Sequence, residues 1–154
     1  MSVRAHELRR ITPGGLSTVG DEFRVEILSA ADVVQVRQRG KEFAARAGFS
    51  NGDQTVIAVA ISEIARNIVT YAKRGEITLH LVTNGERQGV RVTACDEGPG
   101  ISDVDRALED GFSTSGGLGL GLPGARRLMD EFEIITATGH GTTVTMTKWR
   151  RNHG

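Results

Sequence analysis

The chain has 154 residues and a formal net charge of zero, with 19 basic and 19 acidic side chains. This length predicts one domain that buries about 70% of its unfolded surface, and the balanced charge gives no field that favours nucleic acid or a membrane. The single cysteine excludes an internal disulfide. We find no secretory signal and no apolar run of about 18 residues, which favours a cytoplasmic protein with no nucleic-acid and no membrane partner.

The periodicity of the apolar residues divides the chain into three parts. Residues 1–20 lack sustained periodicity and are interpreted as a partly ordered N-terminal extension, followed by a domain over 21–150 and a tail over 151–154. Within the domain, Ser29 is suited to cap the first helix. The patterns predict, in chain order, a strand over 23–28, helices over 30–47 and 51–72, strands over 76–82 and 89–95, a helix over 122–129, and strands over 132–137 and 142–149.

The order of these elements predicts the fold class. The strands over 76–82 and 89–95 are joined by a short turn at Asn84-Gly85, which indicates a β-hairpin. A hairpin cannot belong to a simple repeating βαβ scheme. We therefore expect an α+β fold, in which helices pack on one face of a mixed β-sheet.

Three glycine-rich turns are the most informative local feature. Glycine accounts for 20 of the 154 residues, about twice its average share. Much of this excess lies in Asp96-Glu97-Gly98-Pro99-Gly100, Gly117-Leu118-Gly119-Leu120-Gly121 and Gly139-His140-Gly141-Thr142. Glycine lets the backbone approach a ligand without a Cβ, and the middle turn leads into a helix whose free N–H groups suit phosphate. The spacing fits neither the Rossmann fingerprint nor a Walker loop, so a nucleotide site of another kind is predicted.

Two acidic side chains and one amide are candidates for the chemistry. Glu63 and Asn67 lie four residues apart and share a helix face, where they would provide a base near an acceptor and an oxygen ligand for magnesium. The alternative is an exposed polar face, and the spacing alone favours that alternative. Asp96 is either a turn aspartate that bonds its own backbone or an acceptor for an exocyclic amine such as that of adenine, with Gly98 and Gly100 leaving room for the ring.

Other residues carry weaker signals. The hydroxyl of Thr142 is suited to bond a base or a nearby water, although an ordinary strand residue is an equal interpretation. Cys95 follows an apolar strand pattern and is expected in the core. Arg126 and Arg127 fit a solvated helix face or an acidic partner equally well. The four histidines show no metal-binding spacing and are interpreted as structural or surface residues.

Together, these motifs resemble the N box and the three glycine boxes of the GHKL superfamily of ATPases and kinases, which contains gyrase, histidine kinases and MutL. The resemblance covers about residues 22–149 and implies the Bergerat fold, an α/β sandwich that binds ATP with magnesium. The segments 63–69 and 117–132 are most similar to the RsbT-type serine/threonine switch kinases of the bacterial stressosome. The matching boxes are Glu63-x-x-x-Asn67, Asp96-x-Gly-x-Gly100, Gly119-x-Gly121 and Gly139-x-Gly-Thr142.

The resemblance implies a role for each matching residue. Asn67 is similar to the magnesium ligand, and Glu63 to the residue that orients or deprotonates the acceptor hydroxyl. Asp96 is similar to the adenine anchor, with Thr142 assisting it. The turn from Gly117 to Gly121 would hold the phosphates of ATP.

The connection over 101–116 matches the lid that covers ATP in this superfamily. It has few positive charges, and Arg106 is the one basic residue between Ile101 and Pro123. A positive partner for the γ-phosphate must therefore be Arg106, Arg126 or Arg127, a more distant lysine, or a group of the partner protein.

The resemblance also implies a function and leaves alternatives. The implied activity is ATP- and magnesium-dependent phosphorylation of a serine or threonine on a STAS-domain antagonist, after which the released kinase activates a downstream phosphatase in a stress-response partner switch. The first alternative is a nucleotide-sensing binding module with little or no turnover, such as an anti-sigma factor or a phosphatase activator. The presence of Glu63 favours the kinase without proving it. Direct binding of a sigma factor is a third, weaker alternative.

Overall fold

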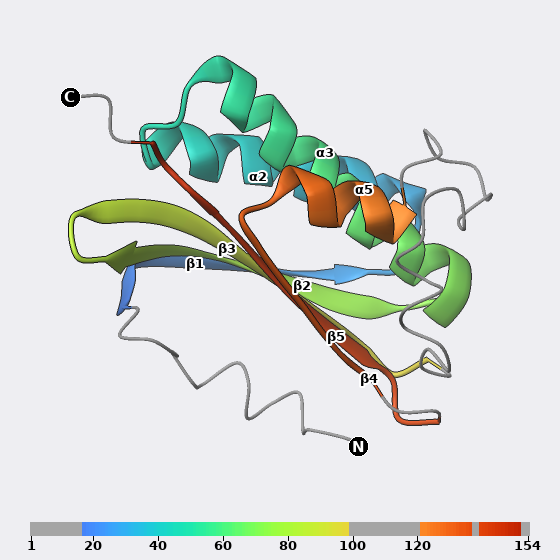
Figure 1. Cartoon of the computed structure of the whole chain (residues 1–154). Coiled ribbons are helices and arrows are strands. Elements are labelled where there is room, and N and C mark those ends of the chain that lie inside the picture. The colour runs from blue at the N-terminus through green and yellow to red at the C-terminus, as the bar shows by residue number, and fades with distance from the viewer. Residues whose placement is uncertain (1–16, 99–120, 137–138, 152–154) are drawn as a thin grey trace.

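The computed structural model describes residues 17–98, 121–136 and 139–151. These residues form two layers, a five-stranded sheet and a layer of helices that covers one of its faces (Figure 1). The strand order is β1-β2-β3-β5-β4. The elements are β1 (Ser17–Ile27), α2 (Ala30–Arg46), α3 (Asn51–Asn67), η2 (Ile68–Ala72), β2 (Gly75–Asn84), β3 (Arg87–Asp96), α5 (Gly121–Leu128), β4 (Glu131–Thr136) and β5 (Thr142–Trp149).

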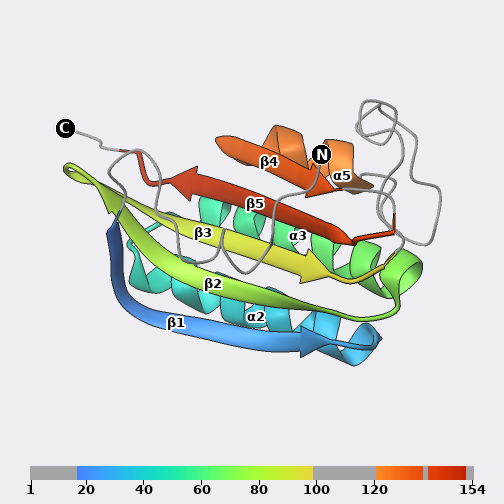
Figure 2. The same ribbon diagram turned by 90° about the horizontal axis from the view of Figure 1, so that it is seen from below.

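The expected α+β class and the single helical layer are confirmed, but every described strand pair is antiparallel where a mixed sheet was expected. The reason lies in the connections. Two helices, α2 and α3, separate β1 from β2 and return the chain to the end of the sheet where β1 stopped. One helix, α5, lies between β3 and β4, which run in the same direction, but β5 is inserted between them and pairs with both (Figure 2).

The helices α2 and α3 begin where their sequences predict. At the start of α2, the carboxylate of Asp32 accepts hydrogen bonds from the backbone N–H groups of Leu28 at 2.8 Å and Ser29 at 3.2 Å. At the start of α3, the hydroxyl of Ser50 accepts from the backbone N–H of Asp53 at 3.2 Å. Such contacts satisfy donors that have no partner within the helix. Gly48, with a φ of +87°, follows the end of α2.

The core lies between α3 and the sheet. By length and composition alone α3 and η2 would suit a membrane span, since an 18-residue window within Asn51–Ala72 has a mean hydropathy of 1.3. Half of that window is buried inside the domain, so we attribute its apolar character to its central place in the core. The close approach of α2 requires Gly40, because a Cβ there would overlap the side chain of Ile61. The fully buried members of the core include Ile27, Ile57, Ile61, Ile77, Leu79, Val90, Val92 and Met146.

Several boundaries differ from the sequence predictions, most clearly at the end of α3, at the hairpin loop and at the start of β1. The α-helix expected to reach Ala72 ends at Asn67 and continues as the π-helical turn η2, in which the N–H of Lys73 donates to the carbonyl of Ile68 at 2.9 Å. The hairpin loop is Gly85-Glu86, one residue later than expected, because Gly85 supplies the positive φ of +64° that a type II′ turn needs at its first position. Strand β1 begins at Ser17, inside the range assigned to the extension.

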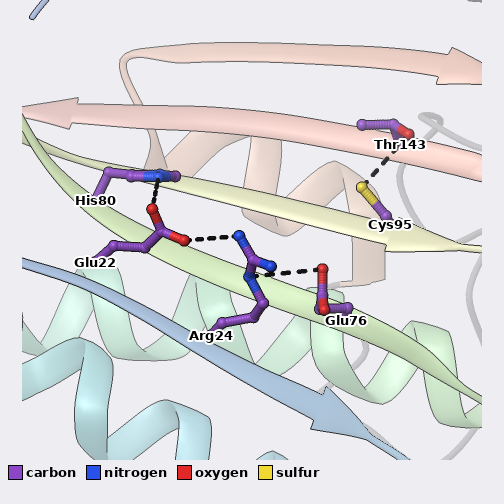
Figure 3. Close-up of polar contacts among 6 residues, drawn as sticks. All are labelled: Glu22, Arg24, Glu76, His80, Cys95 and Thr143. Carbon is purple, nitrogen blue, oxygen red and sulfur yellow. Dashed lines mark hydrogen bonds and ion pairs between the residues drawn. The ribbon is translucent and has the colours of Figure 1, made fainter. Parts of the chain in front are cut away.

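The sheet face opposite the described helices is polar (Figure 3). His80 Nε2 lies 3.2 Å from Glu22 Oε1, and the guanidinium of Arg24 bonds Glu22 at 2.8 Å. Cys95 lies on this face, half-buried, with the hydroxyl of Thr143 donating to its sulfur at 3.7 Å. The prediction that Cys95 is a core residue is therefore wrong: the strand alternates, and its neighbour Ala94 points into the core instead.

Candidate nucleotide site

The predicted site residues that the structure describes lie at one end of the two layers. Asp96, the last residue of β3, is paired with Gly75 at the start of β2 and with Thr142 at the start of β5. Figure 1 shows the end of α3, where η2 follows it, and the start of α5 at this same end. Elements that are far apart in the sequence thus bring the N box and the first and third glycine boxes together.

Glu63 is buried and joins two helices. Its side chain is 3% exposed. Its Oε1 accepts a hydrogen bond from the backbone N–H of Gly121 at 3.2 Å, and its Oε2 pairs with Arg66 Nη1 at 3.2 Å. A buried carboxylate requires partners of this kind, since an unpaired charge in the interior is costly. The exposed-face alternative is therefore wrong for Glu63.

Asn67 is half-buried and is the last residue of α3, where the helix changes from α to π. It lies one helical turn beyond Glu63, so the two side chains share a face, as the spacing predicts. Short π-helical turns are rare and occur often at functional sites. The turn after Asn67 was not predicted, because the sequence of η2 is as compatible with an α-helix as with a π-helix.

Asp96 adopts the turn that its simpler interpretation predicted. Its Oδ1 accepts a hydrogen bond from the backbone N–H of Gly98 at 2.9 Å. Burial raises the pKa of the Asp96 carboxyl above its usual value, and hydrogen bonds from the backbone N–H groups of Gly98 and Thr142 oppose this rise. The carboxylate is thus held by its own turn while it lies half-buried at the end of β3. Such an oriented acceptor also suits an exocyclic amine.

Two glycines bring backbone segments together around Asp96. A Cβ on Gly98 would lie 2.7 Å from the Cβ of Ala72, so Gly98 lets the first turn pack against the end of η2. The expectation that Gly98 also leaves room for an adenine ring stays a prediction. Gly141 has a φ of +82°, and a Cβ there would overlap the carbonyl oxygen of Asp96. The third glycine turn therefore lies directly against the first.

Thr142 is 8% exposed, and its hydroxyl is held by a neighbouring strand. Its Oγ1 lies 2.9 Å from Thr136 Oγ1, and the hydroxyl of Thr136 also lies within hydrogen-bonding distance, 3.0 Å, of the carbonyl of Gly141. Sequence reasoning did not identify Thr136, because its contact with Thr142 depends on the register between β4 and β5. It also missed Arg66, although its position three residues after Glu63 on the same helix was a signal.

Some predicted site residues lie outside the described part of the chain. They are Gly100, Gly117, Leu118, Gly119, Leu120, the lid over 101–116 and Arg106. Gly121 is described and has a φ of +54°. Arg126 and Arg127 are exposed in the last turn of α5, at the opposite end of that helix from Gly121.

The described side chains at the site fit a magnesium ion that is held mainly by a nucleotide. Over residues 17–98, 121–136 and 139–151 we find no group of three or more His, Cys, Asp or Glu side chains that could enclose a metal ion. Magnesium usually keeps several waters and takes few protein ligands besides phosphate oxygens. A single amide oxygen from Asn67, one helical turn beyond Glu63, is consistent with that mode of binding.

Comparisons with known proteins agree with this geometry. Residues 28–148 match the family model of the histidine kinase-like ATPase domain. The chain is 47% identical over 133 residues to the serine/threonine-protein kinase RsbT of Bacillus subtilis (strain 168), covering 86% of this chain and 100% of that protein. It is 32% identical over 99 residues to an anti-sigma F factor of Thermoanaerobacter sp. (strain X514), covering 60% of this chain and 68% of that protein.

A solved structure shows the same fold. The crystal structure of RsbU and RsbW domains from Mycobacterium tuberculosis aligns with 87% of this chain, with a TM-score of 0.61 and 23% sequence identity. The chain spans about a third (34%) of that longer protein. At 23% identity, this likeness shows only that the sheet and the helices are arranged in the same way.

Proposed function

The chain belongs to the histidine kinase-like ATPase domain family, and from this premise we propose that it is a serine/threonine protein kinase that acts on a STAS-domain antagonist in a bacterial partner switch. The observation that carries the proposal is the placement of Glu63. This buried carboxylate contacts the first residue of α5 and lies one helical turn before Asn67. The identity of 47% to a serine/threonine-protein kinase over that protein's full length supports the same activity.

In the proposed reaction, the chain binds and orients both reactants. When bound, ATP supplies the phosphoryl group and magnesium offsets the negative charge of its phosphates. Asp96 accepts a hydrogen bond from the exocyclic amine of adenine, and Thr142, held by Thr136, fixes the neighbouring backbone. The amide oxygen of Asn67 would hold the magnesium ion. The glycine turn that ends at Gly121 would hold the phosphates.

Glu63 is the proposed base. A serine or threonine hydroxyl of the partner attacks the γ-phosphorus, so one oxygen–phosphorus bond forms while the bond between the γ-phosphorus and the bridging oxygen of ADP breaks. The carboxylate of Glu63 accepts the proton that the hydroxyl loses. Arg126 and Arg127 lie at the opposite end of α5, so we assign the positive partner of the γ-phosphate to Arg106, to a more distant lysine or to the substrate protein.

A nucleotide-gated binding module is the second candidate, and the similarity to anti-sigma F factors favours it. In that case ATP would change the affinity for a partner without turnover. We propose that the kinase, once released by its antagonist, activates a downstream phosphatase, whereas the binding module would act as an anti-sigma factor or as a phosphatase activator. Direct binding to a sigma factor is tested separately by co-elution on a sizing column, and failure to co-elute removes that alternative.

The discriminating experiment is incubation of the purified chain with γ-labelled ATP, magnesium and the STAS-domain proteins encoded in the same genome. Label on a serine or threonine of one of them supports the kinase. Nucleotide binding with no label on any of them supports the binding module instead.

A further inference from the structure

Arg66 is a charged residue to which neither the motifs nor the proposed reaction assigns a role. It lies three residues after Glu63 on α3, and its Nη1 is 3.2 Å from Glu63 Oε2. The two side chains differ in exposure, at 34% for Arg66 and 3% for Glu63. The pair therefore extends from the interior of the site to its surface.

The Glu63 carboxylate is fixed at both oxygens. Oε1 accepts from the backbone N–H of Gly121, and Oε2 contacts Arg66. Rotation about the Cγ–Cδ bond moves both oxygens, so two contacts restrain the orientation of the carboxylate more firmly than one contact would. General-base catalysis depends on this orientation, because an oxygen lone pair must point at the proton that it accepts.

We propose that Arg66 is a positioning residue for phosphoryl transfer, which holds the Glu63 carboxylate in the orientation that accepts the proton of the substrate hydroxyl. It acts through Glu63 and touches neither ATP nor the substrate. This inference rests on the proposed kinase function and deepens it. Since Arg66 contacts the carboxylate through a single nitrogen in this structure, a lysine at this position would preserve much of its effect.

The test compares Arg66→Gln and Arg66→Lys with wild type, using the STAS-domain protein that wild type labels. We expect Arg66→Gln to lower kcat by about ten- to a hundredfold while KM for ATP stays within about twofold. Arg66→Lys recovers most of the lost kcat. The matched control is Arg39→Gln, which removes a pair of the same spacing, Arg39 Nη1–Glu42 Oε1 at 3.3 Å, from the exposed side of α2 and leaves both constants unchanged.

A double-mutant cycle shows whether Arg66 acts through Glu63. In a Glu63→Gln background, Arg66→Gln causes no further loss of kcat, because the group that it positions is already absent. A second, equal loss there would overturn the inference. If Arg66→Gln does not fold, Arg66→Met replaces it, since methionine keeps the aliphatic stem without the charge.

The outcomes separate this inference from the function on which it rests. If wild type and Arg66→Gln transfer phosphate equally well, the positioning role is wrong and the kinase stands. If Arg66→Gln raises KM for ATP and leaves kcat unchanged, Arg66 binds nucleotide and the inference is wrong. If wild type labels no STAS-domain protein, the proposed function fails and this inference fails with it.

Discussion

Glu63 Oε1 accepts a hydrogen bond from the backbone N–H of Gly121 at 3.2 Å, which ties the interior of α3 to the first residue of α5. The first N–H groups of a helix have no partner within the helix and favour negative charge. Glu63 supplies that charge from the neighbouring helix. The proposed base and the end of the proposed phosphate-binding turn therefore meet in one contact, although 58 residues separate them.

Replacement of Asn67 tests the proposed magnesium ligand. Asn67→Ala removes an amide oxygen at the junction of α3 and η2. Wild type should bind ATP more tightly with magnesium than with a chelator, and Asn67→Ala should lose most of this difference. Calorimetric titration with ATP under both conditions measures it. Asn51→Ala, at the exposed start of α3, serves as the control, and an undiminished magnesium effect in Asn67→Ala would refute the assignment.

Replacement of Asp96 tests the proposed adenine anchor. Asparagine keeps an oxygen for the N–H of Gly98 but loses the charge. A hydrogen bond to a charged group contributes about 1.5–3 kcal/mol, so we expect Asp96→Asn to weaken ATP binding by about ten- to a hundredfold. Asp53→Asn, in the partly exposed first turn of α3, should bind ATP as wild type does. Equal affinities of Asp96→Asn and wild type would exclude the anchor.

Asp96 also predicts a pH dependence. Burial raises the pKa of its carboxyl, so the group takes up a proton at a higher pH than an ordinary aspartate. Protonation removes the charged acceptor, and ATP affinity of wild type should fall as the pH drops through this raised pKa. The free energy of unfolding should rise as the pH drops over the same range, because protonation removes the cost of burying the charge. ATP titrations at several pH values should show a fall in affinity at the raised pKa for wild type and no such fall for Asp96→Asn.

The contact between the first and third glycine turns makes a stability prediction. Gly139 and Gly141 both have positive φ values, +80° and +82°. A Cβ on Gly139 meets no atom within 4 Å, whereas one on Gly141 overlaps the Asp96 carbonyl oxygen. Gly139→Ala should cost about 1–2 kcal/mol of unfolding free energy, and Gly141→Ala about 2–5 kcal/mol with a loss of ATP binding. Denaturant unfolding measures both, and equal costs would contradict the close approach.

Replacement of Lys73 by glycine is predicted to raise the free energy of unfolding. It follows η2 with a φ of +74°, a conformation that side chains disfavour. Lys73→Gly should relieve this strain and raise the free energy of unfolding by up to about 1 kcal/mol after the entropy cost of glycine. Lys41→Gly, within the helix α2, should lower it by about 1 kcal/mol. A loss of stability in Lys73→Gly would show that the side chain makes a contact that outweighs the strain.

The sequence predicted most of the fold because its signals are local. Alternation marked the strands, and Ser29 and Gly48 marked the bounds of α2. The strand pattern also contained the correct face of Cys95, since Val90, Val92 and Ala94 alternate into the core and leave Cys95 on the other side. The insertion of β5 between β3 and β4 was not predictable from periodicity, because strand pairing is set by contacts between distant segments.

The distinction between local signals and contacts of distant segments also applies to the site. The motifs identified Glu63, Asn67, Asp96 and Thr142, which the structure brings to one end of the sheet. They could not identify partners that arise from tertiary contacts, such as Thr136 beside Thr142 or Ala72 against Gly98. The π-helical turn after Asn67 was also missed, because the apolar residues Ile68 and Val69 suit any helix.

The role of Glu63 is tested most directly by label transfer from γ-labelled ATP to a STAS-domain protein in a single turnover, with wild type and Glu63→Gln compared at equal occupancy by ATP. Glutamine keeps the volume of the buried side chain and removes the base. We predict label on a serine or threonine with wild type, a rate lower by about 10²–10⁴-fold with Glu63→Gln, and similar ATP affinities for both. Label transfer by Glu63→Gln at the wild-type rate would contradict the assignment of Glu63 as the base.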